Sequence, residues 1–310
     1  MTDGSVFSSF LVSPDELLEA LRSSHDDQNQ LTRRLIPLCA TWFLSTDGRK
    51  GIDSFKQKRI QNSRFFDLDK VVDPNTSLPH MLPSALDFAA CMSALGIRRT
   101  DVIVVYDSYE LGIFSAPRVA WTLQVFGHEH VHILNNFRLW LNGGYPTVSG
   151  DWDTPATSSY PTPKKNEYKV VSFEELRDHF LINKENGNNQ WQILDTRAEA
   201  RWSGKAPELR PELASGHMPG SFNLLLSDVL DPNTRAFLPG EEIRAVLERK
   251  GINPQRPIVT SCGSGVTAAI LTVALREARY GDEDNQRLYD GSWREWGQRA
   301  IDYEGLIIRS

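Results

Sequence analysis

The chain carries one sequence pattern twice, and this duplication is the strongest constraint on its fold. Three pairs of segments coincide when the second half is laid over the first with a shift of 155 residues: Gly96-Ile97 on Gly251-Ile252, 102–107 on 257–262, and Asn135-Asn136 on Asp290-Gly291. Similarity at a fixed separation indicates repeated structural units. We therefore expect two copies of one domain.

Each copy alternates helical and strand-like stretches. Apolar residues recur with a helical period in 84–95, and a continuous apolar run follows at 101–106. Such runs are typical of strands that are buried on both faces of a parallel sheet. The sequence predicts an α/β fold with two tandem domains, each a parallel sheet flanked by helices.

A segment rich in proline separates the two copies. Residues 150–165 contain three prolines among Ser, Thr and Asp, a composition typical of linkers. The chain, at 310 residues, is also longer than a single hydrophobic core usually supports. We expect an N-terminal domain at 1–150, a linker at 151–168 and a C-terminal domain at 169–310.

The second copy places a cysteine between a strand and a helix. Cys262 ends the strand pattern 257–261, and a helical pattern follows at 266–277. Amides at the start of a helix favour a thiolate, which is the nucleophilic form of cysteine. Gly263 and Gly265 leave the loop free of bulky side chains, so its amides can face a ligand. Asp107 stands at this position in the first copy, which limits thiol chemistry to the second.

The composition argues against several classes of protein. A net charge of -6 does not fit a nucleic-acid-binding surface, and no run of residues reaches transmembrane length. Three cysteines are too few and too odd in number for a disulfide framework, which favours a reducing compartment. Residues 1–8 lack the apolar core of a secretory signal. We expect a cytoplasmic protein, with a mitochondrial pool left open.

Motifs in both halves carry a resemblance to a known family. They are the loop 262–268, the pair Arg201 and Arg210, the stretch 289–296, and, in the first half, 65–69, 79–83, 115–118 and 126–128. Together they resemble the two-domain rhodanese superfamily, specifically the mercaptopyruvate sulfurtransferases. The resemblance implies two tandem rhodanese-like domains, of which the N-terminal one is not catalytic and the C-terminal one is.

The resemblance also implies how substrate is held. Arg201 and Arg210 match the family's substrate-binding arginines, although 204–210 reads Gly-Lys-Ala-Pro-Glu-Leu-Arg where the family usually has Gly-Thr-Glu-Pro-Glu-Pro-Arg. Thiosulfate-specific relatives carry basic side chains directly after the cysteine, where this chain has Gly263 and Ser264. The expected donor is therefore 3-mercaptopyruvate, whose carboxylate suits a guanidinium fork. The loop residues expected to bind it are Gly263, Gly265, Val266 and Thr267.

A proton relay is implied by the same resemblance. In the family, a serine two residues after the cysteine is joined to a histidine and an aspartate of the N-terminal domain. Ser264, His80 and Asp69 occupy those positions. In such a relay the carboxylate fixes the imidazole tautomer while the imidazole positions or moves a proton. Cys262, Ser264, His80 and Asp69 are thus the expected catalytic residues.

The implied reaction is sulfur transfer through a persulfide. Cys262 takes sulfur from 3-mercaptopyruvate, releases pyruvate, and passes the sulfur to an acceptor. The resemblance suggests thioredoxin, another small thiol, or a sulfur-carrier protein of tRNA thiolation or molybdenum cofactor synthesis as acceptor. We expect no metal or other cofactor, and no direct contact with nucleic acid or membrane.

Three other functions stay open at this point. A thiosulfate sulfurtransferase would use the same cysteine, and a non-enzymatic sulfur-relay scaffold would only dock partners. A cysteine phosphatase needs an arginine six residues after its cysteine, a position held here by Ala268. His128, His130 and His132 share a strand-like alternation that could suggest zinc, but we expect a structural role for them. Cys39 and Cys91 lie in apolar patterns and are expected to pack in the core.

Overall fold

The computed structural model describes residues 6–26, 33–184 and 191–310, and it contains two compact units. Unit 1 consists of Met1–Pro74, Leu82–Lys165 and Pro232–Ala236, and unit 2 consists of Asn75–Met81, Asn166–Asp231 and Phe237–Ser310. This division into units does not test the domain limits expected from the sequence, 1–150 and 169–310, which stay a prediction. The two units are described separately below.

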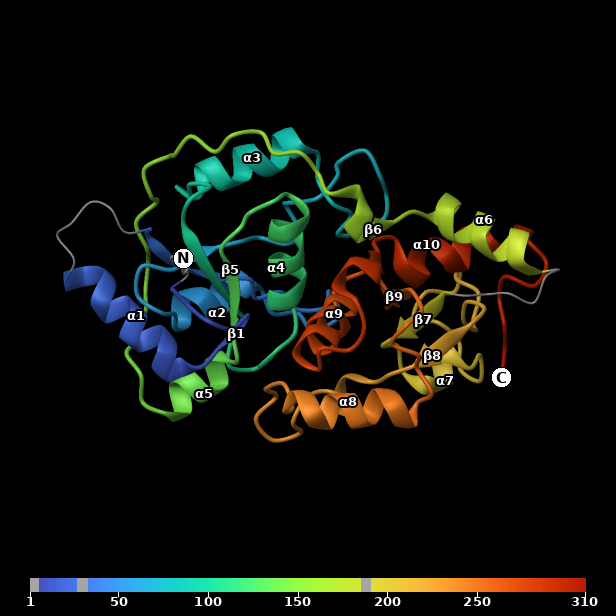
Figure 1. Cartoon of the computed structure of the whole chain (residues 1–310). Coiled ribbons are helices and arrows are strands. Elements are labelled where there is room, and N and C mark those ends of the chain that lie inside the picture. The colour runs from blue at the N-terminus through green and yellow to red at the C-terminus, as the bar shows by residue number, and fades with distance from the viewer. Residues whose placement is uncertain (1–5, 27–32, 185–190) are drawn as a thin grey trace. The chain divides into compact units, whose positions relative to one another are not determined.

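Unit 1 is built on a parallel five-stranded sheet in the order β1-β5-β4-β2-β3. Figure 1 labels β1 and β5 of this sheet and the helices of the unit. Its strands are β1 (Leu11–Val12), β2 (Leu35–Cys39), β3 (Arg64–Phe65), β4 (Val102–Tyr106) and β5 (Val131–Leu134). Its helices are α1 (Pro14–Asp26), α2 (Gly51–Gln57), α3 (Ala85–Ala94), α4 (Ala116–Val125) and α5 (Phe137–Asn142).

Unit 2 repeats this architecture with the order β6-β10-β9-β7-β8. Its strands are β6 (Val170–Val171), β7 (Gln192–Asp195), β8 (Ser221–Asn223), β9 (Ile258–Ser261) and β10 (Gln286–Tyr289). Its α-helices are α6 (Phe173–Lys184), α7 (Glu199–Trp202), α8 (Gly240–Arg249), α9 (Ala268–Glu277) and α10 (Ser292–Arg299). Short 3₁₀ turns lie at Glu167–Lys169, Leu226–Asp228, Glu283–Asn285 and Ala300–Asp302.

The two sheets have the same topology. Numbered from the first strand of its own unit, each sheet has the order 1-5-4-2-3, and every strand pair is parallel. The predicted α/β fold with two parallel sheets is confirmed. The duplication also holds in detail, because Asp107 follows β4 directly and Cys262 follows β9 directly.

The apolar runs of the sequence form the centres of the sheets. All residues of β2, β4 and β9 are buried, as expected for parallel strands with both faces covered. Helix α3 begins where the sequence predicts, because the Ser84 hydroxyl accepts a hydrogen bond from the Asp87 N–H at 3.1 Å and caps the first turn. The apolar runs therefore form the buried strands, and the capping residue marks the start of the helix.

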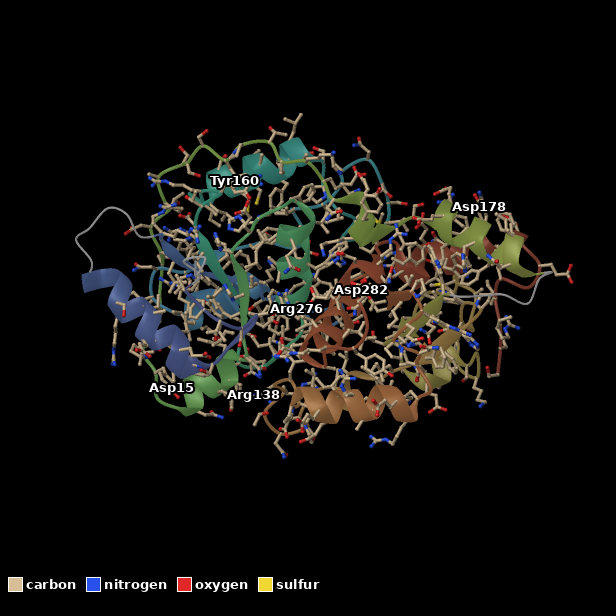
Figure 2. All side chains as sticks on the ribbon, viewed as in Figure 1. Asp15, Arg138, Tyr160, Asp178, Arg276 and Asp282 are labelled. Atoms are coloured by element: carbon tan, nitrogen blue, oxygen red, sulfur yellow. The ribbon has the colours of Figure 1, made fainter. Side chains whose placement is uncertain are left out.

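The proline-rich segment is fixed on unit 1 through Tyr160. The Tyr160 ring is buried and meets Phe88 of α3 edge to face, with 5.7 Å between ring centroids. Figure 2 labels Tyr160 near α3. Its backbone N–H donates to Ser93 Oγ at 3.0 Å. Residues of this segment up to Lys165 thus belong to unit 1. No described helix is both long and apolar enough to cross a membrane.

Candidate active site

Cys262 lies immediately after the central strand of unit 2. Its side chain is buried, at 2% exposure. The sequence predicts a helix from residue 266, but α9 begins at Ala268. Gly265 has a φ of +78°, a left-handed conformation that turns the chain before the helix can start. The result is a six-residue loop, 262–267, between β9 and α9.

An amide of this loop faces the cysteine sulfur. The Gly265 N–H points at Cys262 Sγ, with 3.1 Å between nitrogen and sulfur. Cys262 also donates its own backbone N–H to Ser292 Oγ at 3.2 Å, and the Ser292 hydroxyl donates to the Tyr289 carbonyl at 2.9 Å. An amide aimed at sulfur favours negative charge there, because its dipole is already oriented.

The first turn of helix α10 is hydrogen-bonded to the backbone of the cysteine loop. The N–H of Trp293 donates to the Cys262 carbonyl at 2.9 Å, and the N–H of Arg294 donates to the Gly263 carbonyl at 3.0 Å. The indoles of Trp293 and Trp296 are fully buried, as their helical spacing predicts. On the other side, the hydroxyls of Thr196 and Thr267 lie 2.8 Å apart. The backbone of the cysteine loop is therefore fixed by two separate elements.

A buried ion-pair network lies at the end of β7, and its central residue was missed by the sequence analysis. Arg197 is 3% exposed, donates to both carboxylate oxygens of Asp195, and also donates to Glu208 Oε1 at 2.7 Å. Its guanidinium carbon stands 3.9 Å from the centroid of the Trp293 ring. An aspartate and an arginine two residues apart, directly after an apolar strand, are the signal that could have indicated it.

The expected substrate-binding arginines occupy different environments. Arg201 Nη1 donates to Glu208 Oε2 at 3.4 Å, so one carboxylate orients both Arg197 and Arg201. Arg210 is about half exposed, and its nearest carboxylate is Glu212 at 3.8 Å. Arg201 is thus held by the buried network, whereas Arg210 remains available to a ligand in solution.

The expected relay residues belong to different units. His80 lies in the segment Asn75–Met81, which groups with unit 2, as do Ser264 and Cys262. The His80 side chain is buried, and its backbone has a φ of +59°. Asp69 belongs to unit 1, where its Oδ1 accepts the indole N–H of Trp42 at 2.8 Å. The relay among Ser264, His80 and Asp69 therefore stays a prediction.

Comparison with known proteins identifies the family. The rhodanese-like domain model matches residues 181–299. The chain is 38% identical over 277 residues to a probable 3-mercaptopyruvate sulfurtransferase of Schizosaccharomyces pombe, covering 89% of this chain and 90% of that protein. The chain belongs to the two-domain rhodanese superfamily of sulfurtransferases.

Two further relatives support the same assignment. The mitochondrial thiosulfate/3-mercaptopyruvate sulfurtransferase 1 of Arabidopsis thaliana is 38% identical over 273 residues, covering 84% of this chain and 70% of that protein. The crystal structure of Tum1 from Saccharomyces cerevisiae superimposes with a TM-score of 0.83 at 34% identity, covering 96% of this chain and 97% of Tum1. The resemblance stated from the sequence is confirmed.

The other two cysteines of this sulfurtransferase differ from Cys262. Cys39 lies in the core of unit 1, and burial raises the pKa of its thiol to about 12. Cys91 is only partly buried on α3, so the expected core packing is incomplete there, although burial also raises its pKa to about 12. Both thiols therefore stay protonated near neutral pH. Neither is suited to act as a nucleophile.

The histidines of the first unit have structural contacts. His128 Nε2 lies 2.8 Å from the Asp101 carbonyl, which can only accept, so Nδ1 accepts the Tyr160 hydroxyl at 2.9 Å. His132 Nδ1 donates to the Ser9 carbonyl at 2.8 Å. Within 6–26, 33–184 and 191–310, no three His, Cys, Asp or Glu side chains are grouped as a metal site would require.

Proposed function

We propose that this sulfurtransferase takes sulfur from 3-mercaptopyruvate onto Cys262 as a persulfide and releases pyruvate. The observation that carries the proposal is the loop 262–267, in which the Gly265 N–H faces the cysteine sulfur at 3.1 Å. The two residues after the cysteine, Gly263 and Ser264, carry no charge. A loop of this kind stabilises a sulfur anion through its backbone alone and leaves room for an organic donor.

The first step is attack by the Cys262 thiolate on the sulfur of the donor. The new S–S bond forms as the donor's C–S bond breaks, and the electron pair of that bond leaves with the carbon as the pyruvate enolate. Arg201 and Arg210 bind the carboxylate and carbonyl of the donor, and these contacts favour the developing enolate. Protonation of the enolate carbon gives pyruvate, and Cys262 carries the persulfide.

The proton of this step is assigned to the predicted relay. The Ser264 hydroxyl is placed two residues from the nucleophile, and His80 and Asp69 complete the relay. Asp69 would fix the His80 tautomer, and His80 would orient the Ser264 hydroxyl toward the enolate. The persulfide remains bound by the loop amides of Gly263, Gly265, Val266 and Thr267.

The second step delivers sulfur to a thiol. An acceptor thiolate attacks the outer sulfur, the Cys262 S–S bond breaks, and the Cys262 thiolate is restored. Thioredoxin, another small thiol, or a sulfur-carrier protein of tRNA thiolation or molybdenum cofactor synthesis would serve as acceptor. We place this activity in the cytoplasm, with a mitochondrial pool, since one of the relatives above is named as mitochondrial.

Replacement of the nucleophile tests the proposal. Cys262→Ser should abolish pyruvate release from 3-mercaptopyruvate, because a serine hydroxyl is not ionised near neutral pH and forms no persulfide. The measurement is pyruvate formation, together with a mass spectrum that detects one added sulfur atom after donor treatment. Cys91→Ser is the matched control and should keep the full rate. Pyruvate release that persists in Cys262→Ser would disprove the mechanism, whereas an unmodified protein that releases no pyruvate would favour a scaffold role.

A further inference from the structure

Helix α10 binds the cysteine loop through a further arginine, Arg294. The backbone N–H of Arg294 donates to the carbonyl of Gly263, the residue next to Cys262, at 3.0 Å. Arg294 is partly buried in the first turn of α10. Since the helix start is bound to the loop, the point from which this side chain extends is fixed relative to the nucleophile. No motif described above includes a role for Arg294.

The segment that carries Arg210 is attached to the same helix. Ala214 donates its N–H to the Gly297 carbonyl at 3.2 Å, and its own carbonyl accepts the Trp293 indole N–H at 2.9 Å. The Leu213 N–H donates to the Arg210 carbonyl at 3.1 Å, which closes a turn just before this attachment. Arg210 and Arg294 are therefore carried by two segments that pack against each other.

The charges of these two arginines act on one another. Partial burial, and then the positive charge of Arg210, lower the pKa of the Arg294 guanidinium, while the Glu212 carboxylate raises it. Arg294 makes no ion pair within the described residues, and Glu212 is the carboxylate nearest to Arg210, at 3.8 Å. By contrast, Arg197 and Arg201 are matched by Asp195 and Glu208. Among the described residues, the guanidinium of an arginine whose backbone is bound to the cysteine loop is thus left without a partner carboxylate.

We propose that Arg294 is a specificity-determining residue that supplies the cation for a doubly charged inorganic sulfur donor of the thiosulfate type. The inference rests on the proposed sulfur transfer through Cys262. The loop itself has neutral Gly263 and Ser264 after the cysteine, so a dianion needs its second positive partner from elsewhere. Arg210 and Arg294 together provide two guanidiniums, whereas the single carboxylate of 3-mercaptopyruvate needs fewer.

Sulfur transfer from thiosulfate to Cys262 needs no further reactant. The Cys262 thiolate attacks the outer sulfur of thiosulfate, the S–S bond of thiosulfate breaks, and sulfite leaves with the electron pair. Two negative charges leave with sulfite, and one remains on the persulfide. Because the donor brings one more negative charge than 3-mercaptopyruvate, a cation near the loop acts more strongly on it.

The test compares both donors in Arg294→Gln. We expect kcat/KM for thiosulfate, measured as thiocyanate formation with cyanide, to fall about tenfold or more, because one full charge interaction is lost. For 3-mercaptopyruvate, measured as pyruvate formation, we expect a change of less than about threefold. Arg294→Lys should keep most of the thiosulfate activity because the charge remains. Arg256→Gln, an exposed arginine before β9, removes the same charge and should change neither donor.

Ionic strength gives a second measurement that does not depend on how well the variant folds. In the unmodified protein, added salt should reduce kcat/KM more for thiosulfate than for 3-mercaptopyruvate, since a dianion is screened more strongly. Equal losses for the two donors in Arg294→Gln, no loss for thiosulfate, or an unmodified protein without thiosulfate activity would each overturn the inference. An unmodified protein that turns over neither donor would instead overturn the proposed function.

Discussion

At the scale of single residues, the environment of the candidate site depends on which charged side chains are buried and which of them form ion pairs. Arg197 and Asp195 are both almost fully buried and form a close pair, and Glu208 extends this pair to Arg201. Buried charges are costly unless each is paired and hydrogen-bonded. Glu208 is therefore a positioning residue, since it holds the Arg201 guanidinium while it neutralises Arg197.

Glu208→Gln should separate binding from chemistry. Loss of the carboxylate leaves Arg201 without its anchor, so we expect KM for 3-mercaptopyruvate to rise several-fold, with a smaller change in kcat. The free energy of unfolding should fall by about 1–3 kcal/mol, because a buried charge-assisted hydrogen bond is weakened. Steady-state kinetics and urea unfolding measure the two effects.

The matched control for this variant is Glu212→Gln. Glu212 is about half exposed and stands 3.8 Å from Arg210, so its removal should change the free energy of unfolding by less than about 0.5 kcal/mol. If Glu208→Gln kept the KM of the unmodified protein, Glu208 would have no positioning role.

At the scale of elements, one strand–loop–helix arrangement is used for two purposes. After β9 the amide of Gly265 faces the Cys262 sulfur, and after β4 the loop amides face the Asp107 carboxylate. Asp107 accepts the N–H groups of Phe114, Ser115 and Ala116. The hydroxyl of Ser115 adds a bond of 2.5 Å. In the first unit, the carboxylate of Asp107 itself thus occupies the group of loop amides that could bind an anion.

Asp107→Asn should destabilise unit 1. The new amide would face N–H donors in place of one oxygen, so two buried hydrogen bonds would be lost, at a cost of about 2–3 kcal/mol. The urea midpoint of the unit 1 transition measures this effect. Asp53→Asn, at an exposed position in the first turn of α2, should leave the midpoint nearly unchanged. Equal midpoints for the two variants would show that the loop does not depend on the carboxylate.

At the scale of the whole molecule, each unit contains one buried histidine whose pKa is lowered. Burial lowers the pKa of His128 below its ordinary value of 6.5, with Asp101 opposing and His130 and Arg99 adding to the decrease. In unit 2, burial likewise lowers the pKa of His217. Its Nδ1 donates to the Trp202 carbonyl at 3.0 Å, and its ring stacks on the Trp202 indole with 4.0 Å between centroids. Both folds therefore prefer the neutral imidazole.

The sign of the pH effect follows from these directions. Below pH 6.5 these two histidines bind protons in the unfolded chain but not in the folded units. Their contribution to the free energy of unfolding is therefore present above that pH and is lost as the pH falls. The urea midpoints should decrease between about pH 7 and pH 5.5. His128→Asn should flatten the dependence of unit 1, and His217→Asn should flatten that of unit 2. A slope that persists unchanged in both His128→Asn and His217→Asn would exclude these two groups as its cause.

The sequence by itself determined what depends on local pattern. The shift of 155 residues predicted the repeated unit, the apolar runs predicted β4 and β9, and the position of Cys262 after a strand predicted a loop of amides around a thiol. The start of α9 was predicted two residues early, because side-chain periodicity does not report the φ of Gly265.

The tertiary structure decided which side chains meet. Arg197 and Arg294 look like ordinary charged residues in the sequence, yet one is buried between Asp195 and Glu208 and the other extends from a helix start bound to the cysteine loop. These placements depend on contacts between segments far apart in the chain, which leave no periodic signal in either segment. Sequence thus predicted the fold and the place of the candidate nucleophile, while packing determined which charges lie near it.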